Sequence, residues 1–377
     1  MLRVAIVGAG PAGSAAACHL ARAGCPVTLI DRAAFPRDKV CGDWLTPLAL
    51  DELARTGLDR ATLATAAPTH ATIGRGVLGA PNGRASMHVL DTPGACIVRR
   101  VLDATLRAHA LAAGAHAEQR AVKDPAGDPA LGDQDVIVDA RGANAGTPDA
   151  VGLRAYWTVD AADLPAYART TVTLQTSGAF KRGYGWWFPV SAAGPDVTFN
   201  VGVGLLAADS APGHHVTDFL RHFIATQPVL RDLERRVRER TRPVGYHVGL
   251  ALWHARVADG RVLRIGDAAN LADPLTGDGI GNALRSGRLV AAAIVASADG
   301  AEAAARWQAA CAHELAPDLR IAYALRRALQ STLAKNAAAA LLARSPVLRA
   351  RLHRALFGVT CYRALGARGG RPPATRR

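Results

Sequence analysis

Val4-Ala-Ile-Val-Gly8-Ala-Gly10-Pro-Ala-Gly13, close to the amino terminus, is the stretch of sequence that decides the fold. Residues 2–8 form a short apolar run with β-branched side chains, which predicts a buried parallel strand. The glycines then follow the spacing of a phosphate-binding turn. Gly8 allows the tight turn, Gly10 lets the backbone approach a pyrophosphate, and Gly13 permits close packing of a helix on the strand. The stretch therefore predicts a strand–turn–helix unit that binds a dinucleotide.

The residues that follow support this interpretation. An alanine-rich helix is expected from Gly13 to about Ala23, ending at Gly24, and its amino terminus would offer free N–H groups to a diphosphate. A second strand, residues 26–30, leads to Asp31, which lies 18 positions beyond Gly13. A carboxylate at this position binds a ribose 2′-hydroxyl and disfavours the 2′-phosphate of NADP(H).

A second glycine-rich segment indicates which dinucleotide is bound. Residues 261–265 read as a strand that ends at Gly266-Asp267, and Pro274-Leu-Thr-Gly277-Asp-Gly279-Ile280 then opens a helix. A capped helix behind a flexible loop is one explanation. The other is that Asp267 binds a polyol while the helix beginning near Gly279 points its N–H groups at an electron-rich group. A flavin supplies both groups, so the segment favours FAD.

Three further motifs make the chain resemble the flavoprotein superfamily of aromatic hydroxylases and, within it, the geranylgeranyl reductase family. They are Lys39-Val-Cys41-Gly42-Asp-x-Leu-x-Pro, Val98-Arg99-x-x-Leu-Asp103, and Tyr184-x-Trp186-x-Phe188-Pro189 with Gly202-x-Gly204 downstream. With the two glycine-rich segments, the likeness spans residues 8 to 287. The resemblance implies that the Cys41-Gly42 loop lies beside the flavin, that Arg99 lies near it, and that the aromatic motif contacts substrate.

We therefore expect residues from all these motifs to bind the cofactor: Gly8, Gly10, Ala12, Gly13, Asp31, Arg32, Cys41, Gly42, Arg99, Asp267, Gly277, Gly279 and Ile280. Tyr184, Trp186 and Phe188 are expected to line a cavity for an apolar or aromatic substrate. Cys41 is the candidate catalytic side chain, with water as the alternative proton donor. Two plainer explanations stay open, namely that Cys41 is a small buried hydrophobe and that the aromatic motif packs in a core, with its two tryptophans on opposite faces.

One position departs from the superfamily's pattern. Where a middle Asp-Gly is usual, this chain has Arg141-Gly142, which alters the charge near the pyrophosphate or an incoming nicotinamide. The electron donor therefore stays open among NAD(P)H, a flavin reductase and ferredoxin.

The net charge of +14 is concentrated at the carboxyl end of the 377-residue chain. No acidic residue follows Asp318, whereas 13 lysines and arginines do, so the preceding part is close to neutral. The basic region is either a solvated helix pair with a loose tail or a surface attracted to an anionic partner, such as lipid headgroups or an acidic carrier protein. Nucleic acid is not expected, because no recognition motif or interleaved aromatic residue accompanies the charge.

Composition excludes several classes of protein. Six scattered cysteines without a Cys-x-x-Cys pair disfavour both disulfides and a zinc site, and a reducing cytoplasm fits best. No apolar run reaches the roughly 18–20 residues of a membrane span, so at most a peripheral location at a membrane is expected. Histidine spacing gives no metal motif, and we expect no metal.

The expected architecture is an α/β fold. A Rossmann-type FAD-binding domain (1–70, 95–150 and 255–300) would carry an inserted, mainly antiparallel substrate domain (71–94 and 151–254), a helical region (301–365) and a disordered basic tail (366–377). Alternating patterns predict the strands of the insertion: 71–79, 85–90, 152–158, 171–177, 184–190 and 197–204. Helix is expected within 216–240, bounded by Pro228 and Pro243, and after 301, with breaks near Pro317 and Pro346.

The resemblance implies an FAD-dependent oxidoreductase in which reduced flavin delivers hydride to a carbon–carbon double bond of an apolar, isoprenoid-like substrate. The alternative is an oxygen-dependent monooxygenase or halogenase acting on an aromatic or carrier-tethered intermediate. A flavin-binding scaffold or sensor without turnover is the third hypothesis.

Overall fold

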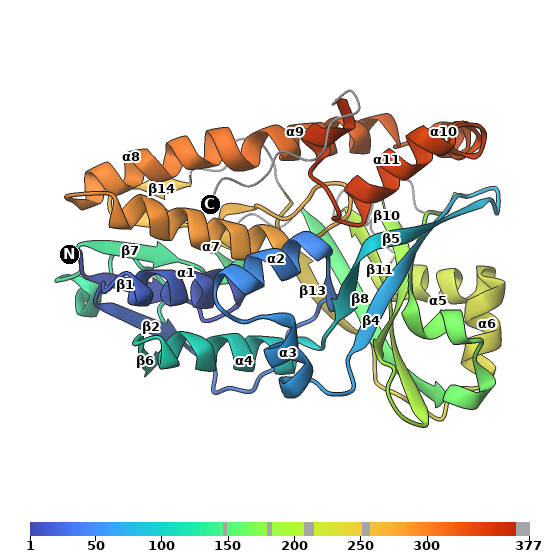
Figure 1. The fold of residues 1–377 in the computed structure, drawn as a ribbon, viewed down its shortest axis with the longest axis horizontal. Helices are drawn as coiled ribbons and strands as arrows, with labels where there is room; N and C mark the ends of the chain where they lie inside the picture. Colours follow the sequence, from blue (N-terminus) through green and yellow to red (C-terminus); the bar gives the residue numbers. More distant parts are fainter. Residues whose placement is uncertain (146–148, 179–182, 207–214, 251–256, 367–377) are drawn as a thin grey trace.

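The computed structural model describes residues 1–145, 149–178, 183–206, 215–250 and 257–366. Two β-sheets lie side by side, and helices from the carboxyl-terminal part of the chain run across both of them (Figure 1). The fold is the predicted α/β class, with a Rossmann-type unit, a second sheet and a helical carboxyl-terminal region.

The first sheet has the strand order β14-β15-β7-β1-β2-β6. Every pairing in it is parallel except that of β14 with β15, and Val4 lies opposite Val27 in the central pair. All four residues of the central strand are buried, as the apolar run predicts. Its strands are β1 (Val4–Val7), β2 (Val27–Asp31), β6 (His116–Gln119), β7 (Val136–Asp139), β14 (Ala258–Asp259) and β15 (Val262–Arg264).

Helices cover this sheet. Helix α1 begins at Pro11, slightly earlier than expected, because proline at the first position has the right φ and lacks only an N–H that no helix bond uses. A Cβ on Gly287 of α7 would lie 2.5 Å from the carbonyl oxygen of Ala12, so glycine there lets α1 and α7 touch. The helices are α1 (Pro11–Arg22), α2 (Pro47–Arg55), α3 (Arg60–Ala66), α4 (Arg99–Ala112), α7 (Ile280–Val295) and α8 (Gly300–Ala310).

The second sheet has the order β12-β8-β11-β10-β9-β4-β5-β3, and β13 also pairs with β8. Its pairs are antiparallel except β4 with β9, which confirms a mainly antiparallel sheet and the six strands predicted for it. Trp44–Leu45 and the end of β5 join it, although both lie outside the predicted insertion. Its strands are β3 (Trp44–Leu45), β4 (Ala71–Gly79), β5 (Ala85–Cys96), β8 (Ala150–Asp160), β9 (Thr171–Gln175), β10 (Gly183–Ser191), β11 (Asp196–Leu206), β12 (Glu239–Arg240) and β13 (Val244–Val248).

Helical structure within 216–240 is less extensive than predicted. Helices α5 (Val216–Thr226) and α6 (Pro228–Arg235) are separated at Gln227, and the chain then enters β12. The residue before a proline disfavours helical backbone, which explains the break. Leu220 and Phe223 of α5 are buried against the second sheet.

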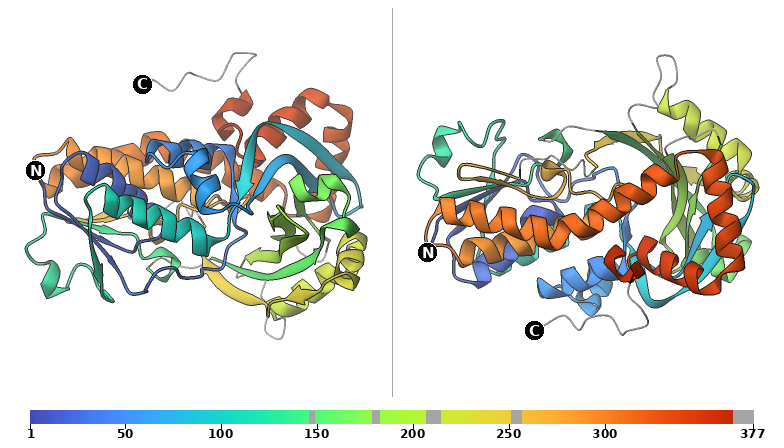
Figure 2. Two further views of the ribbon diagram at one scale, coloured as in Figure 1. Left: turned by 60° about the horizontal axis from the view of Figure 1, so that its bottom comes forward. Right: turned by 90° about the horizontal axis from the view of Figure 1, so that it is seen from above.

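The carboxyl-terminal helices are α9 (Ala316–Ala328), α10 (Thr332–Arg344) and α11 (Pro346–Leu356). The break predicted near Pro317 is wrong: a π-helical turn, Cys311–Leu315, joins α8 to α9, and proline is tolerated in the first turn of a helix. The break near Pro346 is confirmed. Figure 2 shows α10 and α11 beside the second sheet.

The tail predicted to be disordered lies, from residue 367 onward, outside the described residues. Among the described helices, none is both long and apolar enough to cross a bilayer.

Candidate active site

One cavity of about 1750 Å³ is lined by residues of both sheets and of helices α9–α11. Ordinary small-molecule sites occupy roughly 300–1,000 Å³, so this cavity has room for more than one ligand. Of the predicted site residues, all line it except Gly13. The motifs, far apart in sequence, therefore meet in one place.

The glycine-rich turn forms one end of the cavity. Gly8 has φ +108°, and a Cβ there would lie 2.3 Å from the carbonyl oxygen of Ala140. A Cβ on Gly13 would lie 1.8 Å from the Gly8 oxygen, so Gly13 serves helix packing and does not face the cavity. A Cβ on Gly10 would meet only the Arg37 guanidinium, at 3.5 Å. The backbone at Gly10 is thus open to the cavity, and no side chain caps α1.

Asp31 supports this turn and faces the cavity at the end of β2. Its Oδ2 accepts a hydrogen bond from the Ala9 N–H (2.7 Å) and its Oδ1 accepts one from the Ala33 N–H (2.8 Å). Each carboxylate oxygen has a second lone pair, so the side chain can also accept from a ribose hydroxyl.

Arg37 is a cavity residue that the sequence analysis missed. Its guanidinium lies over the Phe35 ring (5.0 Å) and 2.9 Å from Asp103, and it reaches across Gly10. A cation at this point suits a pyrophosphate. No motif or spacing in the sequence marks it, because the loop that carries it has no regular structure.

Asp267 lies at the start of the short helix η6 (Gly266–Ala269), directly beside α7. Its Oδ1 would be 3.2 Å from a Cβ on Gly279, so glycine there leaves the carboxylate room to face the cavity. The Lys39 Nζ is 3.1 Å from the Asp267 Oδ2 and 5.2 Å from the Tyr246 ring centroid. The pair is partly exposed, so we expect it to shape the site and contribute little to stability.

Asp278 is a second residue that was not singled out from the sequence. Its carboxyl faces the cavity at the start of α7, accepting from the Gly281 N–H (3.2 Å) and from the Thr46 hydroxyl (3.4 Å). Burial, reinforced by the charge of Asp273, raises the pKa of Asp278 to about 6. A carboxyl that gains or loses its proton near neutral pH therefore stands where the helix N–H groups begin.

The Cys41-Gly42 loop is fixed from behind by Asp43, which is fully buried with φ +63°. The Asp43 Oδ2 accepts hydrogen bonds from the Tyr156 hydroxyl (2.6 Å) and the Asn200 amide (2.9 Å), and Asn200 also donates to the Cys41 carbonyl (2.6 Å). Burial raises the pKa of Asp43 to about 6 despite these bonds. Burial likewise raises the pKa of the Cys41 thiol, so its Sγ keeps the proton.

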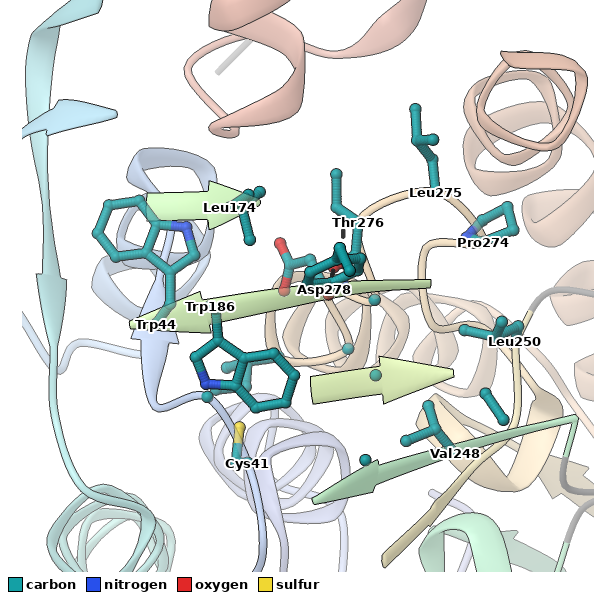
Figure 3. A pocket seen from close by; sticks show the side chains of 18 of the residues that line it. Cys41, Trp44, Leu174, Trp186, Val248, Leu250, Pro274, Leu275, Thr276 and Asp278 are labelled. Atoms are coloured by element: carbon teal, nitrogen blue, oxygen red, sulfur yellow. Dashed lines mark hydrogen bonds between the residues drawn. The ribbon is translucent and has the colours of Figure 1, made fainter. Parts of the chain in front are cut away.

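The aromatic motif forms the opposite wall on β10. The Trp186 and Phe188 rings are stacked at 6.3 Å, and Tyr184 is 6.0 Å from Trp186. The Tyr184 hydroxyl donates to the Thr276 carbonyl, which ties this wall to the loop before α7. Figure 3 shows Cys41, Trp186 and Asp278 around the same pocket.

The Gly-x-Gly motif explains how the wall is built. Gly202 lies opposite Trp186 in the β10–β11 pair, and a Cβ on Gly202 would be 2.3 Å from the indole. Glycine thus leaves the space that the indole fills. Trp187 points to the other face and contacts Phe223 at 6.2 Å, as the sequence predicts.

Arg99 and Arg141, which the sequence analysis singled out, are both paired with carboxylates. Arg99 donates to both carboxylate oxygens of Asp103 at 2.7 Å. Arg141 donates to both oxygens of Asp139 at 2.8 Å, so an acid two positions earlier balances the charge that departs from the superfamily's pattern.

The residues fit FAD. The open backbone at Gly10, the uncapped start of α1 and Arg37 suit a pyrophosphate, Asp31 suits a ribose, and the loop before α7 faces an aromatic wall. The cavity continues between the second sheet and the carboxyl-terminal helices, where its lining is mainly apolar, with Arg326 and Lys335 among the charged exceptions. The apolar residues are Leu78, Val172, Leu174, Leu325, Leu342 and Leu356.

Comparison with known proteins agrees with the site. A family model described as an FAD-binding domain matches residues 1–165. The menaquinone reductase of Mycobacterium tuberculosis is 33% identical over 321 residues, covering 76% of this chain and 75% of that protein. Digeranylgeranylglycerophospholipid reductase 1 of Methanopyrus kandleri is 30% identical over 321 residues, covering 76% and 78%.

Fold and sequence together define the class of this protein, an FAD-dependent oxidoreductase. The chain belongs to the geranylgeranyl reductase family of these enzymes.

Solved structures show how widely this fold is used. A geranylgeranyl bacteriochlorophyll reductase-like protein from Thermoplasma acidophilum matches with a TM-score of 0.72 and 18% identity, covering 89% of both chains. A flavin-dependent brominase matches with a TM-score of 0.74 and 19% identity, covering 97% of this chain and 96% of the other. At these identities the likeness concerns the fold alone.

Proposed function

We propose that this enzyme reduces a carbon–carbon double bond of an apolar, isoprenoid-like substrate. The observation that carries the proposal is the apolar arm of the cavity, which leads from the aromatic wall on β10 to helices α9–α11. The relatives named above, menaquinone reductase and digeranylgeranylglycerophospholipid reductase, support it.

In this proposal the unit around the first sheet holds FAD and the second sheet holds the substrate. The ranges are those expected from the sequence, except that β3 and the end of β5 belong to the second sheet. Gly8, Gly10, Ala12, Asp31 and Arg32 would hold the adenosine and pyrophosphate side, with Gly13 packing behind them. A second group of residues would hold the riboflavin side of FAD: Cys41, Gly42, Arg99, Asp267, Gly277, Gly279 and Ile280. Reduced FAD, when bound, supplies the hydride.

The substrate would lie between the Cys41 loop and the aromatic wall. Trp186 and Phe188 are 7% and 6% exposed, so they exclude water from a double bond placed there. Hydride adds to one carbon of the double bond, and the other carbon then needs a proton. Two cavity groups can hold that proton. They are the Cys41 Sγ, protonated because it is buried, and the Asp278 carboxyl, protonated below about pH 6.

The electron donor in this proposal remains one of three: NAD(P)H, a flavin reductase or ferredoxin. The Arg141–Asp139 pair favours none of them, because the two charges balance each other. Stopped-flow reduction of the bound flavin by each donor in turn distinguishes them.

Oxygen-dependent hydroxylation or halogenation is the second candidate, because a flavin-dependent brominase shares this fold. Anaerobic photoreduction of the flavin, followed by addition of isoprenoid and aromatic acceptors, decides between the two. A reductase reoxidises its flavin with an alkene in the absence of air and yields the saturated product. If reoxidation requires oxygen, the reductase proposal is wrong.

We also propose that the enzyme works in the cytoplasm on a substrate presented by an anionic surface. The basic carboxyl-terminal region supports this, because its charge has no acidic counterpart in the sequence after Asp318.

A further inference from the structure

The corner where α10 turns into α11 leaves large apolar side chains in water. Leu341 is 53% exposed, Val347 is 65% exposed and Leu348 is 37% exposed. Leu342, next to them, is buried and lines the cavity, so the corner is packed onto the protein on one side and bare on the other. Large apolar side chains that are exposed next to one another are candidates for an interaction surface.

This corner, defined here by Leu341, Arg344, Val347, Leu348 and Arg351, lies at the rim of the cavity. Leu341, Val347 and Leu348 are all cavity-lining residues as well as exposed ones. A side chain that lines the cavity and is also exposed to solvent must lie where the cavity opens to the surface. The apolar arm of the active site therefore ends at an apolar patch on the surface.

Arginines stand on the same faces as these apolar residues. Arg344 follows Leu341 by three positions on α10, and Arg351 follows Leu348 by three positions on α11, which places each pair on one side of its helix. Arg344 and Arg351 are exposed, and within the described parts of the chain neither has an ion-pair partner. The rim is therefore both apolar and cationic.

The composition of the carboxyl-terminal tail does not suit it as a cover for this patch. Residues 367–377 contain four arginines, no acidic residue and no large apolar side chain, so they complement neither the charge nor the leucines. The matching partner has an apolar layer beneath an anionic one, which is the chemistry of an anionic lipid bilayer.

We propose that the α10–α11 corner docks onto an anionic lipid bilayer, so that an apolar chain passes from the bilayer into the cavity without crossing water. Leu341, Val347 and Leu348 would enter the headgroup–acyl boundary, and Arg344 and Arg351 would contact lipid phosphates. The docking deepens the proposed function, because it names the surface that presents the substrate.

The test is co-sedimentation of the full-length, FAD-loaded protein with vesicles of phosphatidylcholine alone or with phosphatidylglycerol added. The proposal predicts binding to the anionic vesicles, weakened by salt because the charges are exposed. The double substitution Leu341→Glu, Val347→Glu should lower binding about tenfold or more, since it removes two inserted side chains and adds two repelled charges. Arg344→Gln with Arg351→Gln should weaken binding and flatten its salt dependence.

Val229→Glu is the matched control, because Val229 is 58% exposed on α6, away from the corner. It should bind as the wild-type protein does. The proposal is overturned if the Leu341 and Val347 double variant binds anionic vesicles as the wild type does, or if the wild type does not bind anionic vesicles. It is also overturned if an acidic carrier protein binds while vesicles do not.

The vesicle-binding experiment and the alkene-reduction experiment test the two proposals independently. If vesicles bind as expected but detergent-dispersed alkenes never reoxidise the photoreduced flavin, the reductase proposal is wrong and the docking surface stands. If the reverse is found, only the docking surface is lost.

Discussion

The Asp43 carboxylate and the Tyr156 hydroxyl form a 2.6 Å hydrogen bond between residues 113 positions apart. Asp43 belongs to the loop that carries Cys41, and Tyr156 belongs to β8 of the second sheet. With Asn200, which contacts both Asp43 and the indole of Trp186, this bond fixes the wall of the cavity near Cys41 relative to the aromatic wall. The distance between the two walls is thus set by a buried polar network.

Asp43 should make the protein less stable as the pH rises from about 4 to about 6. Its pKa is 3.8 in a free chain and about 6 when folded, so between these values the folded protein holds a proton that the unfolded chain has lost. The loss amounts to about 3 kcal/mol across the window. Asp43→Asn removes this dependence, and urea unfolding of both proteins at several pH values measures it.

The comparison is internally controlled. Asp232→Asn, at an exposed ion pair on α6, should change stability by less than about 0.5 kcal/mol at every pH. Tyr156→Phe should shift the Asp43 window to higher pH, since it removes a hydrogen bond that lowers the Asp43 pKa. Parallel pH profiles for wild type and Asp43→Asn would contradict the assignment.

Gly202→Ala should displace the Trp186 indole. The added methyl group would lie 2.3 Å from the ring and 2.5 Å from the Leu153 carbonyl oxygen, and overpacking of this kind costs about 1–3 kcal/mol. Gly204→Ala is the control, because its methyl group would lie at an ordinary 3.6 Å from the same ring. We expect changed near-ultraviolet circular dichroism in Gly202→Ala alone. Equal effects of the two substitutions would show that the indole is not held by this contact.

Asp278→Asn should raise the reduction potential of the bound flavin at pH 8. Above its pKa of about 6 the carboxylate opposes the positive end of α7, and asparagine removes that charge. Near pH 5 the carboxyl is protonated, so the variant and the wild type should have nearly the same potential. Equilibration with a reference dye at both pH values measures the difference. A difference that does not depend on pH would mean that the Asp278 charge is not the cause.

The sequence predicted the parts of the site that lie within continuous motifs. The glycine turn, Asp31, the Gly266-Asp267 segment and the start of α7 were all expected, because each has a fixed spacing along one strand–helix unit. The strands of the second sheet were also predicted closely. Apolar and polar residues alternate along each strand with a period of two, and turn residues mark the strand ends.

Other parts depend on contacts between distant residues and leave no local pattern. Asn200 and Asp43 are 157 positions apart, and no local sequence pattern around either residue predicts their hydrogen bond. Arg37 lies in an irregular loop, and only the folded chain brings it over Gly10. The raised pKa of Asp278 comes from burial under other elements, which spacing alone does not reveal.

The most direct test of the account is the FAD affinity of Gly10→Ala. Gly10 has φ −75° and an added methyl group would meet nothing nearer than 3.5 Å, so the variant should fold as the wild type does. The methyl group would point to where the pyrophosphate must lie, and a steric cost of about 1–3 kcal/mol lowers affinity roughly 5- to 150-fold. Gly74→Ala, which has no neighbour within 4 Å, is the control and should bind FAD normally.

Flavin fluorescence quenching and visible absorbance of the purified proteins measure this affinity. A folded Gly10→Ala protein that binds FAD much more weakly than Gly74→Ala is the predicted result. A folded Gly10→Ala protein with unchanged FAD affinity, or a wild-type protein that stays colourless after incubation with FAD, would contradict the account.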